Sequence, residues 1–336
     1  MSQSFDIAVV GATGTVGETI VQILEEREFP VAGLHVLASI ESAGQSVPFR
    51  GKNVRVREVD EFDFSKVRLA FFAAGPAITR SFAARATAAG CSVIDLSGAL
   101  TVAQAPLVVP EINAEVLTAD SATHLISCPS ASATAVAMVL APLRGLLDIR
   151  HVSVTACLAV SAQGREGVSE LARQTTELLN VRPLETRFFD RQMAFNLLAQ
   201  VGAPDDAGHV PLERRLVTEL RELLGMASLK VAASCIQVPV FFGDSFTVSV
   251  QAGARVDLDA VNAALDAAPG VEWVEAGDYP TPVGDAVGQD AVYVGRVRLG
   301  IDDPEQLNLW VTCDNVRKGA ALNAVQVAEL LIKDYV

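Results

Sequence analysis

The chain has 336 residues, with 26 Lys and Arg against 40 Asp and Glu, which gives a formal net charge of −14 at pH 7. This length suggests about two domains, and a content of 50% hydrophobic residues excludes general disorder. Nucleic-acid binding and electrostatic membrane anchoring both need a basic face, which this acidic balance disfavours. We therefore expect no nucleic-acid partner and no membrane partner.

The N-terminal segment MSQSFDIAVVGATG predicts a first strand rather than a signal peptide, because no basic region precedes its apolar stretch. The longest uncharged stretch, Leu125 to Leu143, is interrupted by Pro129 and Pro142 and predicts a strand, a turn and a buried helix. The five cysteines are odd in number and scattered, and they lack the spacing of metal ligands. This pattern favours buried free thiols in a reducing cytoplasm. The four separated histidines also suggest no metal site.

The first half of the chain alternates between strand and helix patterns. Apolar side chains at helical spacing, such as Val16, Ile20, Ile23 and Leu24, predict helices between the strands. Because parallel strands need a crossover connection, this alternation predicts a doubly wound parallel sheet. The predicted strands are Ile7–Val10, Leu34–Ala38, Val54–Val59, Leu69–Ala73, Ser92–Asp95 and His124–Ser127.

A glycine loop, GATGTVG from Gly11 to Gly17, follows the first predicted strand directly and opens a helix. Gly11 permits a tight turn, Gly14 allows a pyrophosphate to approach the backbone, and Gly17 allows close packing of helix on strand. The free amides and the helix dipole would then face the phosphates. We expect a dinucleotide site here; a glycine turn retained for packing alone is the alternative.

The loop after the second strand bears on the type of dinucleotide. It contains Ser39, Glu41 and Ser42, and no Lys or Arg occurs before Arg50. An acidic residue at this place commonly binds the ribose hydroxyls, whereas a basic one pairs with a 2′-phosphate. Glu41 therefore favours NAD over NADP, although it could equally be a solvated loop charge.

The pattern changes after about residue 150. A long β run, His151–Val160, precedes a polar helix at Gly167–Leu179, and Val201–His209 has the composition of a loop. From 246 to 250, apolar and polar residues alternate, which predicts a half-buried strand of a mixed or antiparallel sheet. At the end of the chain, the spacing of Leu322, Val325, Ala328, Ile332 and Tyr335 predicts a helix.

Several segments, collinear over nearly the whole chain, resemble the aspartate-β-semialdehyde dehydrogenase family. They include GATGTVG at Gly11, FFAAG at Phe71, VVPEIN at Val108, CIQVPVFFGDS at Cys235, YPTPVGDAVGQDAVYVGRVR at Tyr279 and DNVRKGAALNAVQVAELL at Asp314. The last segment is long and favours this family over the related N-acetylglutamyl-phosphate reductases. The pattern is most similar to the divergent Usg-type members.

The resemblance implies an α/β fold with an N-terminal Rossmann-like doubly wound sheet and an α+β dimerisation and substrate domain. Residues 1–128, completed by a C-terminal helix at 315–336, would bind NAD(P), and residues 129–314 would form the second domain. It also implies a cytoplasmic homodimer acting on a small molecule of amino-acid biosynthesis. The apolar strands of the second half support the dimer, because a lone chain would expose a hydrophobic sheet.

The resemblance also implies site residues. Those expected at the cofactor are Gly11, Thr13, Gly14, Thr15, Val16, Gly17, Ser39, Glu41, Ser42, Gly75, Ser161 and Asn315. Those expected in the substrate pocket are Ser130, Gln237, Glu213 and Arg215. Glu213 and Arg215 could instead lie on a solvated helix face, and Arg317 and Lys318, which lie near the nicotinamide in the resemblance, could be helix-entry charges.

The residues that carry the family's chemistry are substituted. Family members hold an acyl group as a thioester on a cysteine, use a histidine as the base, and bind the anionic substrate with arginines. Here the cysteine position is Ala131, the histidine position is Asp244, and an arginine position is Gln237; Leu158 replaces a glutamine. Alanine cannot form a thioester, and an ionised Asp244 would repel an acyl phosphate, so we expect little or no such activity, as in a pseudoenzyme.

Another residue could substitute for the missing nucleophile. Cys128 lies three positions before Ala131, but a buried structural thiol is the simpler interpretation. Ser130 or Ser132 would need a base such as Asp244, which could instead be a polar pocket residue or a cap. The alternative function is therefore an active NAD(P)-dependent oxidoreductase that acts on a different small substrate without a covalent cysteine intermediate.

Overall fold

The computed structural model describes residues 4–117 and 124–334. The chain divides into two compact units, Met1–Ser130 with Ala320–Val336, and Ala131–Gly319. The first boundary lies after Ser130 rather than after residue 128, because helix α4 (Ala131–Leu140) belongs to the second unit. The return to the first unit falls at Ala320 rather than at residue 315, within a π-helical turn at Arg317–Leu322.

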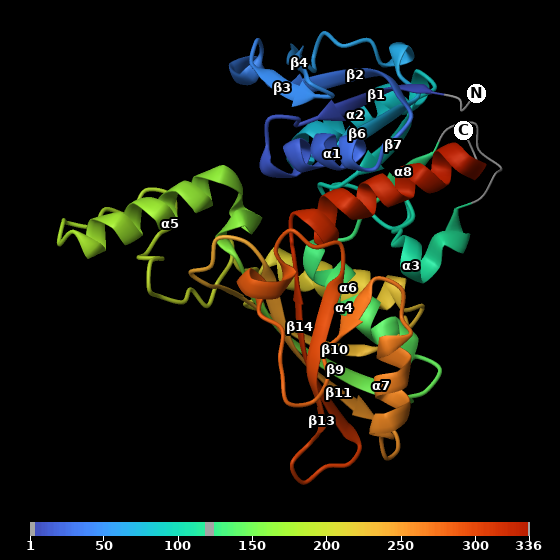
Figure 1. The fold of residues 1–336 in the computed structure, drawn as a ribbon, viewed down its shortest axis with the longest axis vertical. Coiled ribbons are helices and arrows are strands. Elements are labelled where there is room, and N and C mark those ends of the chain that lie inside the picture. Colours follow the sequence, from blue (N-terminus) through green and yellow to red (C-terminus); the bar gives the residue numbers. More distant parts are fainter. Residues whose placement is uncertain (1–3, 118–123, 335–336) are drawn as a thin grey trace. The chain divides into compact units, whose positions relative to one another are not determined.

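The first unit contains a six-stranded sheet in the order β5-β2-β1-β6-β7-β8 (Figure 1). Every strand pair in it is parallel. This is the order of a dinucleotide-binding doubly wound fold, whose ligands lie where the strand order reverses, here between β1 and β6. The predicted fold class is confirmed. The strands are β1 (Phe5–Val10), β2 (Val31–Ala38), β5 (Arg57–Glu58), β6 (Leu69–Phe72), β7 (Ser92–Asp95) and β8 (Leu125–Ser127).

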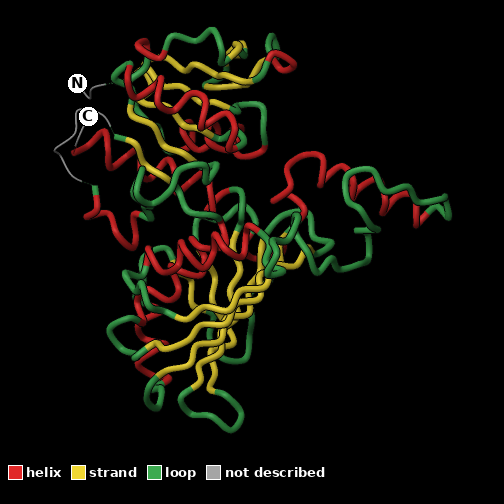
Figure 2. Tube along the Cα trace, turned by 180° about the vertical axis from the view of Figure 1, so that it is seen from behind, coloured by secondary structure: helices red, strands yellow, loops and turns green. Residues whose placement is uncertain are grey.

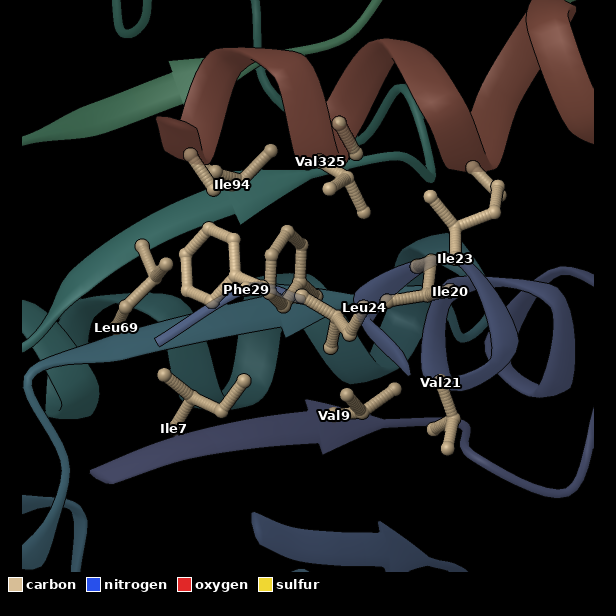
Figure 3. Packing of buried hydrophobic residues seen from close by; sticks show 14 of the residues in the cluster. Ile7, Val9, Ile20, Val21, Ile23, Leu24, Phe29, Leu69, Ile94 and Val325 are labelled. Carbon is tan, nitrogen blue, oxygen red and sulfur yellow. The ribbon is translucent and has the colours of Figure 1, made fainter. Parts of the chain in front are cut away.

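Helices α1 (Thr15–Glu26), α2 (Pro76–Ala88), α3 (Pro110–Asn113) and α8 (Asn323–Asp334) complete the first unit. The apolar stripe of α1 is fully buried at Ile20, Ile23 and Leu24. Figure 3 shows this stripe, with Phe29 and Ile94, packed beneath Val325 of α8. Burial of one such aliphatic side chain contributes about 1.5–3 kcal/mol, so α8 is part of the core rather than an appendage.

One detail of the first unit differs from the sequence-based prediction. The run Val54–Val59 is not one strand: β3 (Ser46–Phe49) and β4 (Lys52–Arg55) form a separate antiparallel hairpin, and only β5 joins the main sheet. The hairpin turn places Arg50 and Gly51 at φ of 48° and 70°, the left-handed conformation that two-residue hairpins favour. Tyr335, predicted on the last helical stripe, lies outside the described residues.

The second unit is built on a mixed six-stranded sheet in the order β10-β9-β11-β14-β13-β12, whose long strands are seen in Figure 2. Strands β10–β9 and β12–β13 pair in parallel, and the other pairs are antiparallel. This confirms the predicted mixed sheet. The strands are β9 (Ile149–Leu158), β10 (Lys230–Gln237), β11 (Asp244–Ala252), β12 (Val271–Trp273), β13 (Val292–Leu299) and β14 (Gln306–Cys313).

Helices α4, α6 (Pro211–Leu223) and α7 (Leu258–Asp266) contact this sheet, whereas α5 (Gly164–Leu179) contacts mainly the turn that precedes it. The apolar side chains of the strands, such as Val152, Val154 and Val250, are buried. Side chains of the opposite strand face, including Ser153, Ser234 and Thr247, are exposed. The expectation of an exposed apolar sheet is therefore wrong, because strand alternation directs the apolar side chains inward and leaves a small polar face open.

Short helical turns complete the described chain: Ile40–Ser42, Phe64–Lys66, Ala114–Val116, Ala141–Leu143, Val160–Gln163, Pro282–Ala286 and Arg317–Leu322. In residues 4–117 and 124–334, none of the helices has both the length and the apolar character that crossing a membrane requires.

Candidate functional site

The glycine loop forms the connection between β1 and α1. Gly11 has a φ of +83°, and a Cβ atom placed on it would lie 2.7 Å from the carbonyl oxygen of Ala73. A Cβ atom on Gly17 would lie 2.1 Å from the carbonyl oxygen of Gly11. Neither position has room for a side chain, so these two glycines let helix, turn and strand approach one another closely.

Gly14 is different from its two neighbours in the motif. It is the N-cap of α1 and, without a side chain, it leaves the first amides of the helix uncapped. A Cβ atom there would approach only the Gly11 carbonyl oxygen, at 3.3 Å. The first amides of a helix have no intrahelical partner, so those of the α1 N-terminus, beginning at Thr15 and Val16, can receive an anion. The missing side chain at Gly14 and these amides fit a pyrophosphate.

A second helix begins at the same edge of the sheet. Gly75 follows β6 and is the N-cap of α2, and a Cβ atom there would have no neighbour within 4 Å. Since β1 and β6 are neighbours, the Gly11 and Gly75 turns flank the point where the strand order reverses. The structure thus brings together the expected cofactor residues from the two turns.

The loop after β2 contains a basic neighbour that sequence reasoning missed. Ser39 donates a hydrogen bond from Oγ to Glu41 Oε2 at 2.9 Å, and Glu41 is exposed. A guanidinium nitrogen of Arg55 lies 3.9 Å from where a Cβ atom of Gly44 would be. The hairpin of β3 and β4 returns Arg55 to this loop, so a positive charge does lie beside it. Arg50, in contrast, donates to the Phe29 and Val31 carbonyl oxygens.

Ala131, at the family's nucleophile position, is the first residue of α4. Its Cβ atom lies 2.6 Å from where a Cβ atom of Gly319 would be, so the methyl group packs directly on the backbone of Gly319. Of the two nearby serines, Ser130 is half-buried and Ser132 is buried. The methyl group of Ala131 has no nucleophilic chemistry.

Asp244, at the family's histidine position, is the first residue of β11 and is buried. Its Oδ1 atom accepts a hydrogen bond from the Ala159 amide at 2.8 Å. Burial and the nearby charge of Asp314 together raise the pKa of this carboxyl to about 7, against the lowering effect of the Ala159 amide. The raised pKa favours the protonated, neutral carboxyl over the ionised one that the sequence led us to expect.

Gln237, at the family's arginine position, is the last residue of β10 and is buried. Its Nε2 atom donates to the carbonyl oxygen of Leu158 at 2.7 Å, and its Oε1 atom accepts from Gln163 Nε2 at 3.4 Å. Leu158 and Gln237 are opposite each other in the parallel pair β9–β10. The side chain of Gln237 is therefore neutral, and both ends of its amide are hydrogen-bonded within the second unit.

Gln237 and Gln163 lie on the wall of a cavity of about 730 Å³ in the second unit. The segment from residue 188 to 203 forms most of the remaining wall. Gln174 holds this segment, because its Oε1 atom accepts from the amides of Met193 and Ala194 at 2.7 and 3.1 Å. Of this wall, only residues 201–203 fall within the predicted loop Val201–His209. The rest of the segment has no periodic pattern, so the sequence predicted no element there.

Ser161 and Asn315, both expected at the cofactor, bind each other. Asn315 donates from Nδ2 to Ser161 Oγ at 3.0 Å, and its Oδ1 atom accepts the Gly243 amide at 3.0 Å. Both side chains are buried. The pair therefore connects the turn after β9, the residue before Asp244 and the segment after β14.

Glu213 points into the second unit rather than along a solvated helix face. Its Oε2 atom accepts the Val210 amide at 3.1 Å, which caps α6, and its Oε1 atom accepts the Cys235 amide at 3.0 Å. Arg215 donates to Glu219 at 2.6 Å, an ion pair within the same helix. Arg317 pairs with Asp290 at 2.5 Å, and Lys318 is buried.

Three of the buried thiols are poorly suited to act as nucleophiles. All five cysteines are free, and Cys128 is buried. Burial raises the pKa of Cys91 and of Cys235 to about 12, and it raises the pKa of Cys313 well above its ordinary value. The thiolate is the reactive form, so these groups are inert at neutral pH. In the part of the chain that the structure describes, no three His, Cys, Asp or Glu residues gather as a metal site.

Two family models match the chain. The model described as semialdehyde dehydrogenase, NAD binding domain, matches residues 6–119, and the model described as semialdehyde dehydrogenase, dimerisation domain, matches residues 140–318. The chain belongs to the semialdehyde dehydrogenase family. The matched ranges of this family fall on the parallel sheet and on the mixed sheet, respectively.

Similar semialdehyde dehydrogenase relatives cover the chain from end to end. A USG-1 protein homolog from Azotobacter vinelandii is 60% identical over 99% of each chain. The structure of a probable aspartate-semialdehyde dehydrogenase from Pseudomonas aeruginosa is 59% identical, with a TM-score of 0.97 over 99% of this chain and 100% of that one. Aspartate semialdehyde dehydrogenase II from Vibrio cholerae, solved in complex with ASA, is 42% identical, with a TM-score of 0.95 over 100% of both chains. The expected family is confirmed.

Proposed function

We propose that this chain is a semialdehyde-dehydrogenase-like protein that binds NAD(P) and a small molecule but has lost the thioester chemistry of its family. The observation that carries this proposal is the state of the three substituted positions. Ala131 presents a methyl group to Gly319, Asp244 is bound to Ala159, and Gln237 is bound to Leu158. Each side chain contributes to packing or backbone hydrogen bonding, and none is a thiolate, an imidazole or a guanidinium.

The dinucleotide would be held by the first unit. The α1 N-terminus at Gly14 and the turn at Gly75 would face its phosphates. When bound, the nicotinamide would supply or accept a hydride. Glu41 favours the free ribose hydroxyls of NAD, whereas Arg55, 3.9 Å from the position of a Gly44 Cβ atom, supplies a positive charge for a 2′-phosphate. Because the two charges act in opposite directions, we expect the site to favour NAD over NADP only weakly.

The assembly we propose is a homodimer in the cytoplasm. The family model for the second unit is a dimerisation domain, and the small polar face of its sheet, including Ser153, Ser234 and Thr247, is open to a second copy. Five free cysteines fit a reducing compartment. Size-exclusion chromatography with light scattering tests the dimer, and a monomeric mass would refute it.

The decisive experiment separates binding from turnover. Fluorescence titration with NADH and NADPH is expected to give saturable binding to the wild-type chain. Turnover of aspartate semialdehyde with phosphate and NAD or NADP is expected to be at least about a thousandfold below that of a cysteine-bearing relative. Trapping of a covalent acyl adduct during this reaction would refute the loss of thioester chemistry. Absence of any dinucleotide binding would refute the scaffold assignment.

A second candidate function is favoured by one observation, the pKa of Asp244 near 7. A carboxyl with this pKa is suited to general acid–base work at neutral pH. The chain would then be an NAD(P)-dependent oxidoreductase on another small substrate, without a covalent intermediate. Reduction of a panel of aldehydes, retained in Cys128→Ala and lost in Asp244→Asn, would support this function over the first.

A further inference from the structure

The second unit contains another cavity, of about 420 Å³, next to α7, β12 and β13. Its lining includes Asn262, Trp273, Tyr279, Arg296 and Arg298. Along the sheet, Asp244 is opposite Cys313, which is opposite Val292 at the start of β13. Arg298 lies further along β13, at roughly 3.3 Å per residue, so this cavity is separate from the site around Asp244.

Two arginines stand together on this cavity without a carboxylate partner. Arg298 donates from Nη1 to the carbonyl oxygen of Arg296 at 2.8 Å. Neither guanidinium forms an ion pair with any Asp or Glu that the structure describes, in a chain with 40 acidic residues. Burial and the adjacent charge of Arg296 lower the pKa of Arg298. Two cations that form no ion pair attract an anion, and guanidinium groups bind carboxylate and phosphate in a planar, bidentate geometry.

The backbone at this place is strained. Arg296 has a φ of 50°, in the left-handed region, at the irregularity of the β13–β14 register between Gly295 and Arg298. Glycine or asparagine adopts this conformation more easily than arginine. Strain of this kind clusters at ligand sites, where the surrounding structure holds a side chain in a required position.

The other walls of the cavity supply further recognition. The Oδ1 atom of Asn262 is buried and has no hydrogen-bond partner among the described residues. Rotation of this amide exchanges its oxygen and nitrogen, so Asn262 can present a donor to an anion. Trp273 and Tyr279 add aromatic surface to the lining. Asp278, which also lines the cavity, accepts the Tyr279 amide at 2.8 Å.

We propose that this cavity binds a small organic anion. Its carboxylate or phosphate group lies between Arg296 and Arg298, with Asn262 as a further donor, and its planar or apolar body lies against Trp273 and Tyr279. The proposal is independent of the function proposed above, because it uses neither the glycine loop nor the substituted family positions.

The tryptophans provide a local test. The chain has two, Trp273 in the cavity and Trp310, whose Nε1 atom donates to the Pro280 carbonyl oxygen. In a Trp310→Phe background, tryptophan emission reports Trp273 alone. Titration with phenyl phosphate, benzoate and inorganic phosphate at constant ionic strength is expected to give saturable quenching. The tighter of the two aromatic anions identifies the preferred head group, and inorganic phosphate is expected to bind more weakly than phenyl phosphate.

Three variants decide the assignment. Arg298→Gln and Arg296→Gly are expected to raise the Kd of the aromatic anion at least about tenfold, whereas Arg255→Gln, at an exposed site of the same unit, leaves it unchanged. Arg296→Gly also relieves the backbone strain, so the anion-free protein is expected to melt at no lower temperature.

Three results would overturn the proposal: no saturable quenching in the Trp310→Phe background with both arginines intact, an unchanged Kd in both cavity variants, or an equal rise in Kd for Arg255→Gln. Arg298 also borders the open face of the sheet. Light scattering is therefore measured on each variant. A variant that loses the dimer but keeps anion binding assigns the arginines to the interface and refutes the proposal.

Discussion

The Oδ1 atom of Asp244 lies 2.8 Å from the amide nitrogen of Ala159 and thereby joins the start of β11 to the residue that follows β9. The carboxyl is buried, and its pKa is raised from 3.8 to about 7. The folded protein therefore holds a proton that the unfolded chain releases near pH 4. The stability that this proton contributes is fully present below about pH 4 and is lost as the pH rises through about 7.

Asp244→Asn is predicted to remove this pH dependence, because asparagine keeps an acceptor for the Ala159 amide and has no charge to bury. At pH 8 the variant should exceed the wild type in free energy of unfolding by roughly 2–4 kcal/mol, and the difference should shrink towards pH 5. Urea titrations at both pH values measure it. Asp244→Ala, which removes the acceptor, serves as the contrast and should be less stable than Asp244→Asn. A pH-independent difference would contradict the raised pKa.

The glycine loop predicts opposite results at two positions. Gly17→Ala should lower the free energy of unfolding by about 3 kcal/mol or prevent folding, because its Cβ atom would lie 2.1 Å from the Gly11 carbonyl oxygen. Gly14→Ala should cost only about 1 kcal/mol, since Gly14 has a φ of −82° and its Cβ atom would meet one close atom, the Gly11 carbonyl oxygen at 3.3 Å. It should weaken NADH binding about tenfold, because the methyl group occupies the approach of the pyrophosphate.

Thermal melting and NADH fluorescence measure these two effects. Gly145→Ala, where a Cβ atom meets nothing within 4 Å, is the matched control for a glycine outside the loop. Unchanged NADH affinity in a folded Gly14→Ala variant would place the pyrophosphate elsewhere.

Glu213 is predicted to be a structural residue of the second unit. Its carboxylate accepts the amides of Val210 and Cys235, so Glu213→Ala leaves both without this partner. We expect a loss of about 1–3 kcal/mol in the free energy of unfolding, as for the removal of a helix cap or of a buried acceptor. Glu222→Ala, an exposed position on the same helix, should change it by less than about 0.5 kcal/mol. Equal effects of the two substitutions would contradict this role.

Gln174 is predicted to control the mobility of the cavity wall. Gln174→Ala removes the acceptor of the Met193 and Ala194 amides, and these amides should then exchange with deuterium at least about tenfold faster. Ser169→Ala, at an exposed position of the same helix, should leave the exchange rates unchanged. Protection of both amides at the wild-type level would show that other contacts hold this segment.

Local sequence signals predicted the parts of the fold that depend on local chemistry. The glycine loop, the βα alternation and the apolar stripe of the last helix each follow from residues close together in the chain, and all were found. The hairpin of β3 and β4 was missed, because Pro48 and the Arg50–Gly51 turn interrupt the alternation that marks a strand. With it, the position of Arg55 beside Gly44 was missed as well.

Side-chain roles in the second unit depended on long-range pairing. The bond of Gln237 to Leu158 follows from the register of β9 and β10, and the pairing of Ser161 with Asn315 spans distant segments of the chain. Glu213 faces inward because its helix lies against β10. No pattern within a short window of sequence specifies such partners. The resemblance located these residues but not what each side chain binds.

Helix α8 supplies Val325 and Leu331 to the hydrophobic core of the first unit, although the entire second unit separates it in sequence from β8. On the ribosome, residues 131–319 emerge before this helix does, so the N-terminal sheet acquires this layer only after the second unit has been synthesised. Truncation of the chain before α8 would therefore damage the first unit more than the second.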